Sequence, residues 1–183
     1  MGSVVTRDEA LHLQLKLAHM RLGLGVGAND AEAVLRSLPS IGLRYAAQDR
    51  SARALAAWWQ QQAQCVQVLH PALAGAHGHD HWQAVCARQG QAGLAAGLFS
   101  VVLDARYSQS QVDAFCDALR LFRIGYSWGG PVSLVVPYAL ASMRSRPHSQ
   151  LRSGHLVRFS TGLESAPALM QDLQQSLQTH LPT

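Results

Sequence analysis

Apolar residues at helical spacing dominate the first third of the chain. Two apolar stripes follow the first helix that we expect, at Leu11, Leu15, Ala18 and Leu22 and at Leu13, Leu17 and Met20. Thr6 and Glu9 match a capping box, so we expect this helix to begin beside Thr6. Helical spacing returns from Val34 onwards, and Pro39 predicts a kink or a restart within it. The pattern therefore predicts a helical region that ends near Gln62.

The pattern changes to short apolar runs after Gln64. These runs predict strands at 66–69, 97–103, 133–136 and 155–161. One amphipathic helix is expected in the middle of this region, with its apolar face at Val112, Phe115, Cys116, Leu119 and Phe122. A second is expected at 165–178, and the glycine- and histidine-rich segment 74–97 reads as a loop. This order of elements predicts a small α+β domain, an antiparallel sheet with helices on one face.

Composition narrows the class of protein. The chain has 183 residues, 48% of them hydrophobic and 14% charged, which suffices for a core and argues against disorder. No apolar run reaches the roughly 18 residues that span a bilayer, and the N-terminus does not read as a signal peptide. Three widely spaced cysteines do not form a disulfide framework or a CxxC site. We therefore expect a cytoplasmic protein that does not enter a membrane.

The basic residues restrict the chemistry that this chain can perform. The net charge is +4, and of the 15 basic residues all but Lys16 are arginine. The arginine bias is typical of a GC-rich genome. Any reaction that needs a lysine amine must therefore use Lys16 or borrow an amine from elsewhere.

Arg158 is the strongest candidate for a binding residue. Side chains alternate along a strand, so Val157 and Phe159 are expected to face the core and Arg158 the opposite side. A guanidinium presents a planar fork that matches a carboxylate with two parallel hydrogen bonds, which a lysine cannot do. The alternative, from the strand alone, is an ordinary exposed strand arginine.

A second candidate segment is Tyr126-Ser127-Trp128-Gly129-Gly130. The two glycines allow the backbone to approach a ligand closely, while the serine and the aromatic residues offer a hydroxyl and flat apolar walls. The alternative is a tight turn whose aromatic residues fill a core.

Two further clusters have simpler interpretations as surface loops. His77, His79 and His81 could chelate zinc or nickel, but alternating histidines in a polar loop have no fixed hydrogen-bonding partners behind them. A basic stretch could contact nucleic acid, but no aromatic residue interleaves with it; it comprises Arg144, Arg146, His148, Arg152 and His155. We expect no metal site and no nucleic-acid partner.

Taken together, these segments carry a family resemblance that covers the whole chain. The segments that match are 2–6, 70–73, 78–79, Trp82, 121–130, 133–134, Arg158 and 162–164. They resemble the pyridoxal-phosphate-dependent trans-sulfuration enzymes of Cys/Met metabolism, in particular the cystathionine β-lyase branch, because Trp128 stands where γ-acting relatives usually have leucine. The chain departs from the family pattern at Pro131-Val132, usually an aromatic-Glu pair, and at Pro39-Ser40, usually basic-Thr.

The resemblance implies the C-terminal part of a fold-type I, aspartate-aminotransferase-like enzyme. The fold class expected is α/β with an α+β C-terminal domain. Residues 1–62 would form the end of the large cofactor domain and a connector helix, and residues 63–183 the entire small domain. The resemblance also implies a homo-oligomer, a tetramer in the family.

The resemblance assigns roles to four residues. Arg158 would bind the α-carboxylate of a sulfur amino acid, and Ser127 with the backbone around Trp128 would complete that pocket. Tyr126 and Trp128 would line the substrate side of the cofactor, pyridoxal 5'-phosphate. The family reaction is the β-elimination of cystathionine to homocysteine, pyruvate and ammonia, a step of methionine biosynthesis.

The family lysine that forms a Schiff base with the cofactor has no counterpart in this chain. Lys16 is expected on a helix stripe that faces away from any recognisable pocket, with nothing around it to depress its pKa. We therefore expect the chain alone to be inactive and not to bind the cofactor covalently. Two alternatives stay open: a non-catalytic module that associates with itself or with a separate N-terminal half, and a γ-acting member of the family.

Overall fold

The computed structural model describes residues 2–87, 92–143 and 150–183. Its contacts divide the chain into two compact units, Met1–Gly42 and Leu43–Thr183. This division does not test the domain boundary that the family resemblance implies after residue 62, which stays a prediction. Among the described residues, no helix combines the length and the apolar character that crossing a bilayer requires.

The regular elements described in the first unit are helices, as the periodicity predicts. It contains α1 (Glu9–Arg21), α2 (Ala28–Ser37) and the 3₁₀ helix η1 (Leu38–Ser40), and none of the residues in these elements is buried. The predicted capping box was wrong, because Asp8 is the N-cap of α1 and its Oδ1 accepts from the Leu11 amide. Thr6 instead accepts from the Asp8 amide through Oγ1.

The helix α3 (Ile41–Trp59) restarts directly after η1, which confirms the interruption that Pro39 predicts. From Leu43 onwards it belongs to the second unit. Its inward face contributes Ala52, Leu55, Ala56 and Trp59 to the core. The helix ends at Trp59, with turns continuing to Gln62.

A five-stranded mixed sheet forms the second unit, in the order β1-β2-β5-β4-β3. The strands are β1 (Cys65–Leu69), β2 (Leu98–Leu103), β3 (Arg123–Ile124), β4 (Leu134–Tyr138) and β5 (His155–Ser160). The four strands predicted from the sequence are present and pair antiparallel. The two-residue strand β3 was not predicted, and it pairs with β4 in parallel.

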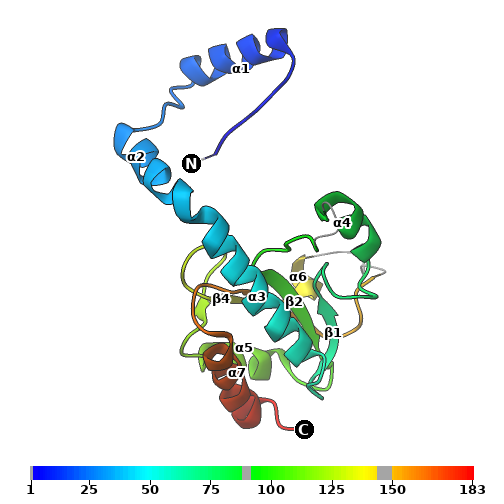
Figure 1. The fold of residues 1–183 in the computed structure, drawn as a ribbon. Coiled ribbons are helices and arrows are strands. Elements are labelled where there is room, and N and C mark those ends of the chain that lie inside the picture. Colours follow the sequence, from blue (N-terminus) through cyan, green and yellow to red (C-terminus); the bar gives the residue numbers. More distant parts are fainter. Residues whose placement is uncertain (1, 88–91, 144–149) are drawn as a thin grey trace. The chain divides into compact units, whose positions relative to one another are not determined.

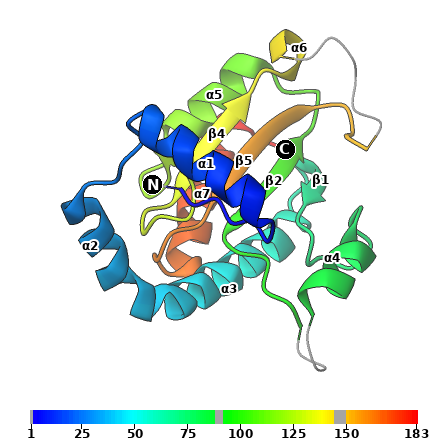
Figure 2. The ribbon, with the colours of Figure 1, turned by 90° about the horizontal axis from the view of Figure 1, so that it is seen from above.

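Three helices cover one face of the sheet and share one hydrophobic core with it (Figures 1 and 2). They are α3, α5 (Gln109–Asp117) and α7 (Ala166–His180). The segment predicted as a loop at 74–97 was partly wrong, because it contains α4 (His79–Cys86). A short helix, α6 (Leu140–Met143), follows β4. The final helix begins at the N-cap Ser165, which agrees with the predicted start.

Phe159 lies at the centre of the core. Its ring contacts those of Trp59, Phe99 and Phe122, with centroid distances of 5.7, 5.4 and 5.2 Å. These residues come from α3, β2, β5 and the segment before β3, so one aromatic cluster joins the sheet to its covering layer. Aromatic pairs at such distances stabilise a core beyond their buried area, by about 0.5–1.5 kcal/mol each.

All three cysteines are free. Burial raises the pKa of the Cys65 thiol to about 11 and that of Cys116 to about 12, with Asp113 and Asp117 adding to the effect at Cys116. Cys86 is exposed. The two shifted thiols are protonated at neutral pH and are poor nucleophiles.

Asp172 on α7 holds the turn that leads into β3. Its carboxylate accepts from the amides of Arg120, Leu121 and Phe122 at 2.8–3.4 Å and from Gln175 Nε2 at 2.9 Å. The side chain is only 4% exposed, so these amides have an anion in place of water. The segment that enters the 125–130 loop is therefore anchored to the last helix.

We expect Asp172→Ala to lower the free energy of unfolding by about 3 kcal/mol, because it leaves buried backbone donors without a partner. The measurement is a urea titration followed by circular dichroism. Asp117→Ala on α5 removes an exposed carboxylate and should change stability by less than about 0.5 kcal/mol. Equal midpoints for the two variants would contradict the anchoring role of Asp172.

Candidate carboxylate-binding site

Arg158 lies at mid-sheet, on the face opposite the helical core. It pairs with Ser100 of β2 on one side and with Val136 of β4 on the other. Its neighbours Val157 and Phe159 are fully buried in the core, whereas Arg158 is half-buried. The alternation predicted for this strand is thereby confirmed.

The 125–130 loop lies against Arg158. Nη2 of Arg158 donates to the carbonyls of Gly125 and Ser127, both at 3.4 Å, and the guanidinium carbon lies 5.6 Å from the centre of the Trp128 ring. The structure thus brings together the two segments that the sequence singles out. Ser127 contributes its carbonyl here, and no hydrogen bond of its hydroxyl is found within the described residues.

Two tyrosines complete the surroundings of Arg158. Tyr126 is 71% exposed and its ring contacts the Tyr138 ring edge-on, at 6.5 Å. The Tyr138 ring in turn lies 5.9 Å from the guanidinium carbon of Arg158. Sequence reasoning missed Tyr138, although strand alternation places it on the same face of β4 as Val136, the partner of Arg158.

These contacts leave part of the guanidinium open. A cation–π contact contributes about 0.5–1 kcal/mol at an exposed site, and hydrogen bonds at 3.4 Å are long and weak. Within the described residues, Nε and Nη1 of Arg158 have no hydrogen-bond partner, and no carboxylate lies within ion-pair distance of it. The free edge is suited to two parallel hydrogen bonds with a carboxylate.

Glu164 and Ser133 hold the far end of the loop. Glu164 accepts from the Ser133 amide at 3.0 Å and from the Ser133 hydroxyl at 2.8 Å, while Ser133 Oγ accepts from the Gly162 amide at 2.8 Å. The Pro131 carbonyl accepts from the Leu163 amide. A Cβ at position 162 would collide with that carbonyl, so glycine permits this close approach.

Helix α3 holds the middle of the loop. Gln48 donates through Nε2 to the Gly130 carbonyl at 2.8 Å, and the backbone carbonyl of Gln48 accepts from Thr161 Oγ1 at 3.0 Å. Gly129 adopts a left-handed conformation, with φ of 74°, and its amide donates to Ser160 Oγ at 3.4 Å. The double glycine thus forms a turn that is fixed to β5 and α3.

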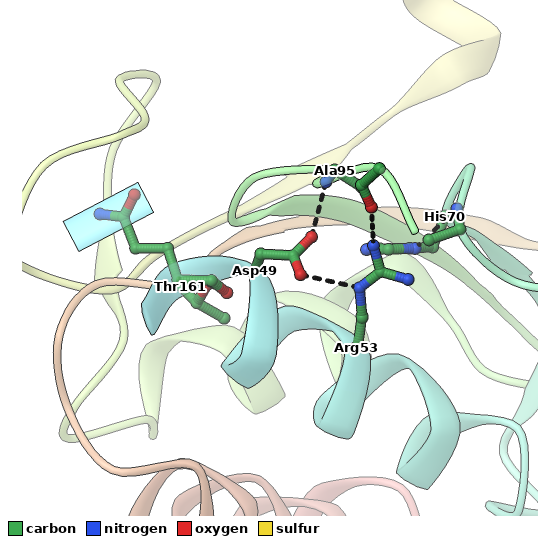
Figure 3. Close-up of polar contacts among 8 residues, drawn as sticks. Asp49, Arg53, His70, Ala95 and Thr161 are labelled. Atoms are coloured by element: carbon green, nitrogen blue, oxygen red, sulfur yellow. Dashed lines mark hydrogen bonds and ion pairs between the residues drawn. The ribbon is translucent and has the colours of Figure 1, made fainter. Parts of the chain in front are cut away.

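A separate, partly buried network lies beside β2 (Figure 3). Asp49 accepts from the Ala95 amide at 2.6 Å and from Arg53 Nε at 2.8 Å, and Arg53 Nη2 donates to the Gly93 carbonyl at 2.6 Å. The Arg53 guanidinium also stacks over Trp82 of α4. The network therefore joins α3 to the segment that returns from α4 to the sheet.

His70 is buried next to this network. Its Nδ1 accepts from the Ala72 amide at 3.1 Å, and its Nε2 is buried without a partner among the described residues. Burial lowers the pKa of His70 from its ordinary 6.5, the Arg53 charge lowers it further, and Asp49 opposes the shift. The imidazole is consequently neutral at pH 7.

Two of the three clustered histidines were wrongly expected to lie in a loop. His79 and His81 lie on α4, and His79 bonds to the Pro71 carbonyl through Nδ1 and contacts the Trp82 ring. No group of three potential metal ligands is found in the part of the chain that the structure describes. Residues 144–149 of the basic stretch lie outside the described residues.

Comparisons with known proteins identify the family. The family described as Cys/Met metabolism PLP-dependent enzyme matches residues 1–178. The chain belongs to this family. Cystathionine β-lyase of Bordetella avium is 35% identical over 97% of this chain, and that of Salmonella typhimurium is 34% identical over 87%. The intact enzymes of the family are pyridoxal-phosphate-dependent.

Solved structures of similar proteins identify the fold. Cystathionine γ-synthase from Xanthomonas oryzae pv. oryzae superimposes with a TM-score of 0.76 and 32% identity, over 95% of this chain and 44% of that one. The fold is therefore that of a fold-type I enzyme's C-terminal portion. The chain spans only 40–43% of the two β-lyases named above.

The described residues do not by themselves fit the family cofactor. The sole lysine, Lys16, is exposed on α1, and the open 670 Å³ hollow beside β1 is lined mainly by glutamines, histidines and aliphatic residues, with no lysine. Arg152 is the one basic residue there besides histidine, and it is exposed. That hollow therefore offers neither an amine for a Schiff base nor a buried arginine or lysine for a phosphate.

Removing the Glu164 clamp should loosen the candidate site. We expect Glu164→Ala to lower the free energy of unfolding by about 1–2 kcal/mol and to speed exchange of the Ser133 and Gly162 amides, because both depend on this clamp. Hydrogen exchange read by NMR is the measurement. Glu32→Ala removes an exposed helix ion pair and serves as the control. Unchanged exchange at Ser133 would contradict the role of Glu164.

The neutral, buried His70 predicts a pH dependence of stability. Because its folded pKa is lowered, the stability it contributes is complete above about pH 6.5 and is lost as the pH falls through the folded value. The free energy of unfolding of the wild type should therefore fall relative to His70→Phe, by up to about 1 kcal/mol per pH unit, as the pH falls below 6.5. Urea midpoints test this, with exposed His77→Phe as the control. Parallel pH profiles for wild type and His70→Phe would refute it.

Proposed function

We propose that this chain provides the substrate-carboxylate pocket of a carbon–sulfur lyase that acts on a sulfur amino acid. The observation that carries the proposal is Arg158, whose guanidinium has an open edge at mid-sheet beside the 125–130 loop. A planar, permanently charged fork binds a carboxylate in one orientation. The loop is attached to β5, α3 and Glu164, so the pocket is formed before the ligand arrives.

Each residue of this pocket has a distinct task. Arg158 binds and orients the α-carboxylate. Ser127 contacts the guanidinium through its carbonyl and offers its exposed hydroxyl to the same ligand. Trp128 and Tyr126 present exposed aromatic faces that wall the ligand off from water.

The reaction that we assign to the intact enzyme is the β-elimination of cystathionine to homocysteine, pyruvate and ammonia. Support comes from the β-lyases among the relatives and from Trp128 in the loop. The alternative within the family is a γ-acting enzyme, since a γ-synthase shares the fold. No residue of the proposed pocket is assigned the proton transfers. We therefore assign them to a lysine of another segment and expect the chain alone to be inactive.

The second candidate function is that of an interaction module, and the exposed apolar side chains of the first unit favour it. Its helices have no buried residue, and its large apolar side chains are exposed; they include Leu11, Leu13, Met20, Leu22, Leu24, Leu35 and Ile41. Exposed apolar surface of this extent marks an interaction site. We propose that this unit associates with a second copy, in a homo-oligomer, or with a separate N-terminal half.

The test combines catalysis and binding. With pyridoxal phosphate and L-cystathionine added, the purified chain should release no pyruvate and show no visible absorption band that borohydride removes. L-Cystathionine should nevertheless bind, and Arg158→Lys should weaken this about tenfold because one point charge replaces two parallel hydrogen bonds.

Exposed Arg123→Lys on β3 is the matched control and should bind as the wild type does. Pyruvate release would contradict the assignment of catalysis to another segment. Equal affinities for Arg158→Lys and the wild type would contradict the carboxylate pocket.

A further inference from the structure

Tyr138 is placed beside Arg158 by the register of the sheet. Val136 of β4 is the direct partner of Arg158, and Tyr138 pairs with Leu156, two residues further along each strand. A residue two positions from the direct partner is a diagonal neighbour on the same face, within reach of long and aromatic side chains. Tyr138 thus faces Arg158 from the strand itself, unlike Trp128, which is carried by the loop.

The ring of Tyr138 makes the contact, rather than its hydroxyl. The ring centre lies 5.9 Å from the Arg158 guanidinium carbon, and the ring also meets Tyr126 edge-on, with an interplanar angle of 66°. In the described ranges no hydrogen bond of the Tyr138 hydroxyl is found. The aromatic face is therefore the feature that matters, and phenylalanine should supply it equally well.

Arg158 needs such a contact because its polar restraints are weak. Both hydrogen bonds come from Nη2, both are 3.4 Å long, and both end on the loop. No acidic side chain pairs with Arg158 in the part of the chain that the structure describes. A long side chain held only in this way would sample several rotamers, whereas a ring on a paired strand gives it a fixed surface.

We propose that Tyr138 is a positioning residue that orients Arg158 so that its Nε and Nη1 edge is open to a carboxylate. Tyr138 acts through Arg158 and does not itself contact the ligand. The ligand-binding half of this proposal rests on the proposed function, whereas the orientation half stands on the contacts alone.

The experiment uses the full chain labelled with ¹⁵N and compares Tyr138→Phe with Tyr138→Leu. The Nε–H resonance of Arg158, assigned by its loss in Arg158→Lys, reports the ring directly because an aromatic face shifts the proton above it. Tyr138→Phe should keep both this chemical shift and the affinity for L-cystathionine. Tyr138→Leu should move the resonance and weaken binding about two- to fivefold, the effect of losing one exposed cation–π contact.

The outcomes distinguish the positioning role of Tyr138 from the proposed carboxylate pocket. An unchanged Arg158 Nε–H shift in Tyr138→Leu, with the variant folded by circular dichroism, overturns the positioning role. A changed Arg158 Nε–H chemical shift in Tyr138→Phe also overturns it, because the aromatic ring would then not determine that shift. If the wild-type resonance does not respond to L-cystathionine, the proposed carboxylate pocket fails, while the comparison of Phe and Leu variants still decides the orientation.

Discussion

The packing of Phe159 against three aromatic rings is the interaction on which the candidate site depends. Phe159 is fully buried between Trp59, Phe99 and Phe122. Because side chains alternate along a strand, this fixes Arg158 on the opposite face of the sheet. A one-residue slip of β5 would bury a guanidinium and expose the phenyl ring, and both changes are costly. The core therefore sets the direction of the Arg158 side chain.

The loop that meets Arg158 is positioned by polar contacts. Gln48 binds its middle from α3, Glu164 binds its far end through Ser133, and Asp172 anchors the turn before it. The three side chains come from α3, from the segment between β5 and α7, and from α7. A loop that is fixed at three points loses less entropy when it receives a ligand, which is how a rigid scaffold supports a binding site.

Much of the second unit could be predicted from its sequence, because short apolar runs and period-two alternation are local signals. The strands at Val68, Val101 and Val157 and the orientation of Arg158 all follow from such patterns. The two-residue strand β3 has no pattern of its own and exists only because β4 lies beside it. The helix α4 was obscured by the glycine- and histidine-rich composition of the segment 74–97 that contains it.

The roles of Asp172 and Tyr138 could not be predicted, because they depend on partners about fifty and twenty residues away in the sequence. At the N-terminus, Thr6 and Asp8 are both good capping residues, and only geometry shows that Asp8 accepts from Leu11. The family relationship adds information that local patterns do not contain, and the carboxylate pocket that we propose at Arg158 draws on it.

The central claim is that Arg158 and the 125–130 loop are assembled within this chain before any ligand binds. Nuclear Overhauser effects between the Arg158 side chain and the Trp128 and Tyr138 rings, measured on the labelled chain without ligand, test it most directly. The account predicts cross-peaks from Arg158 to both rings, together with contacts between Gln48 and Gly130. An Arg158 side chain without cross-peaks to either ring would contradict it.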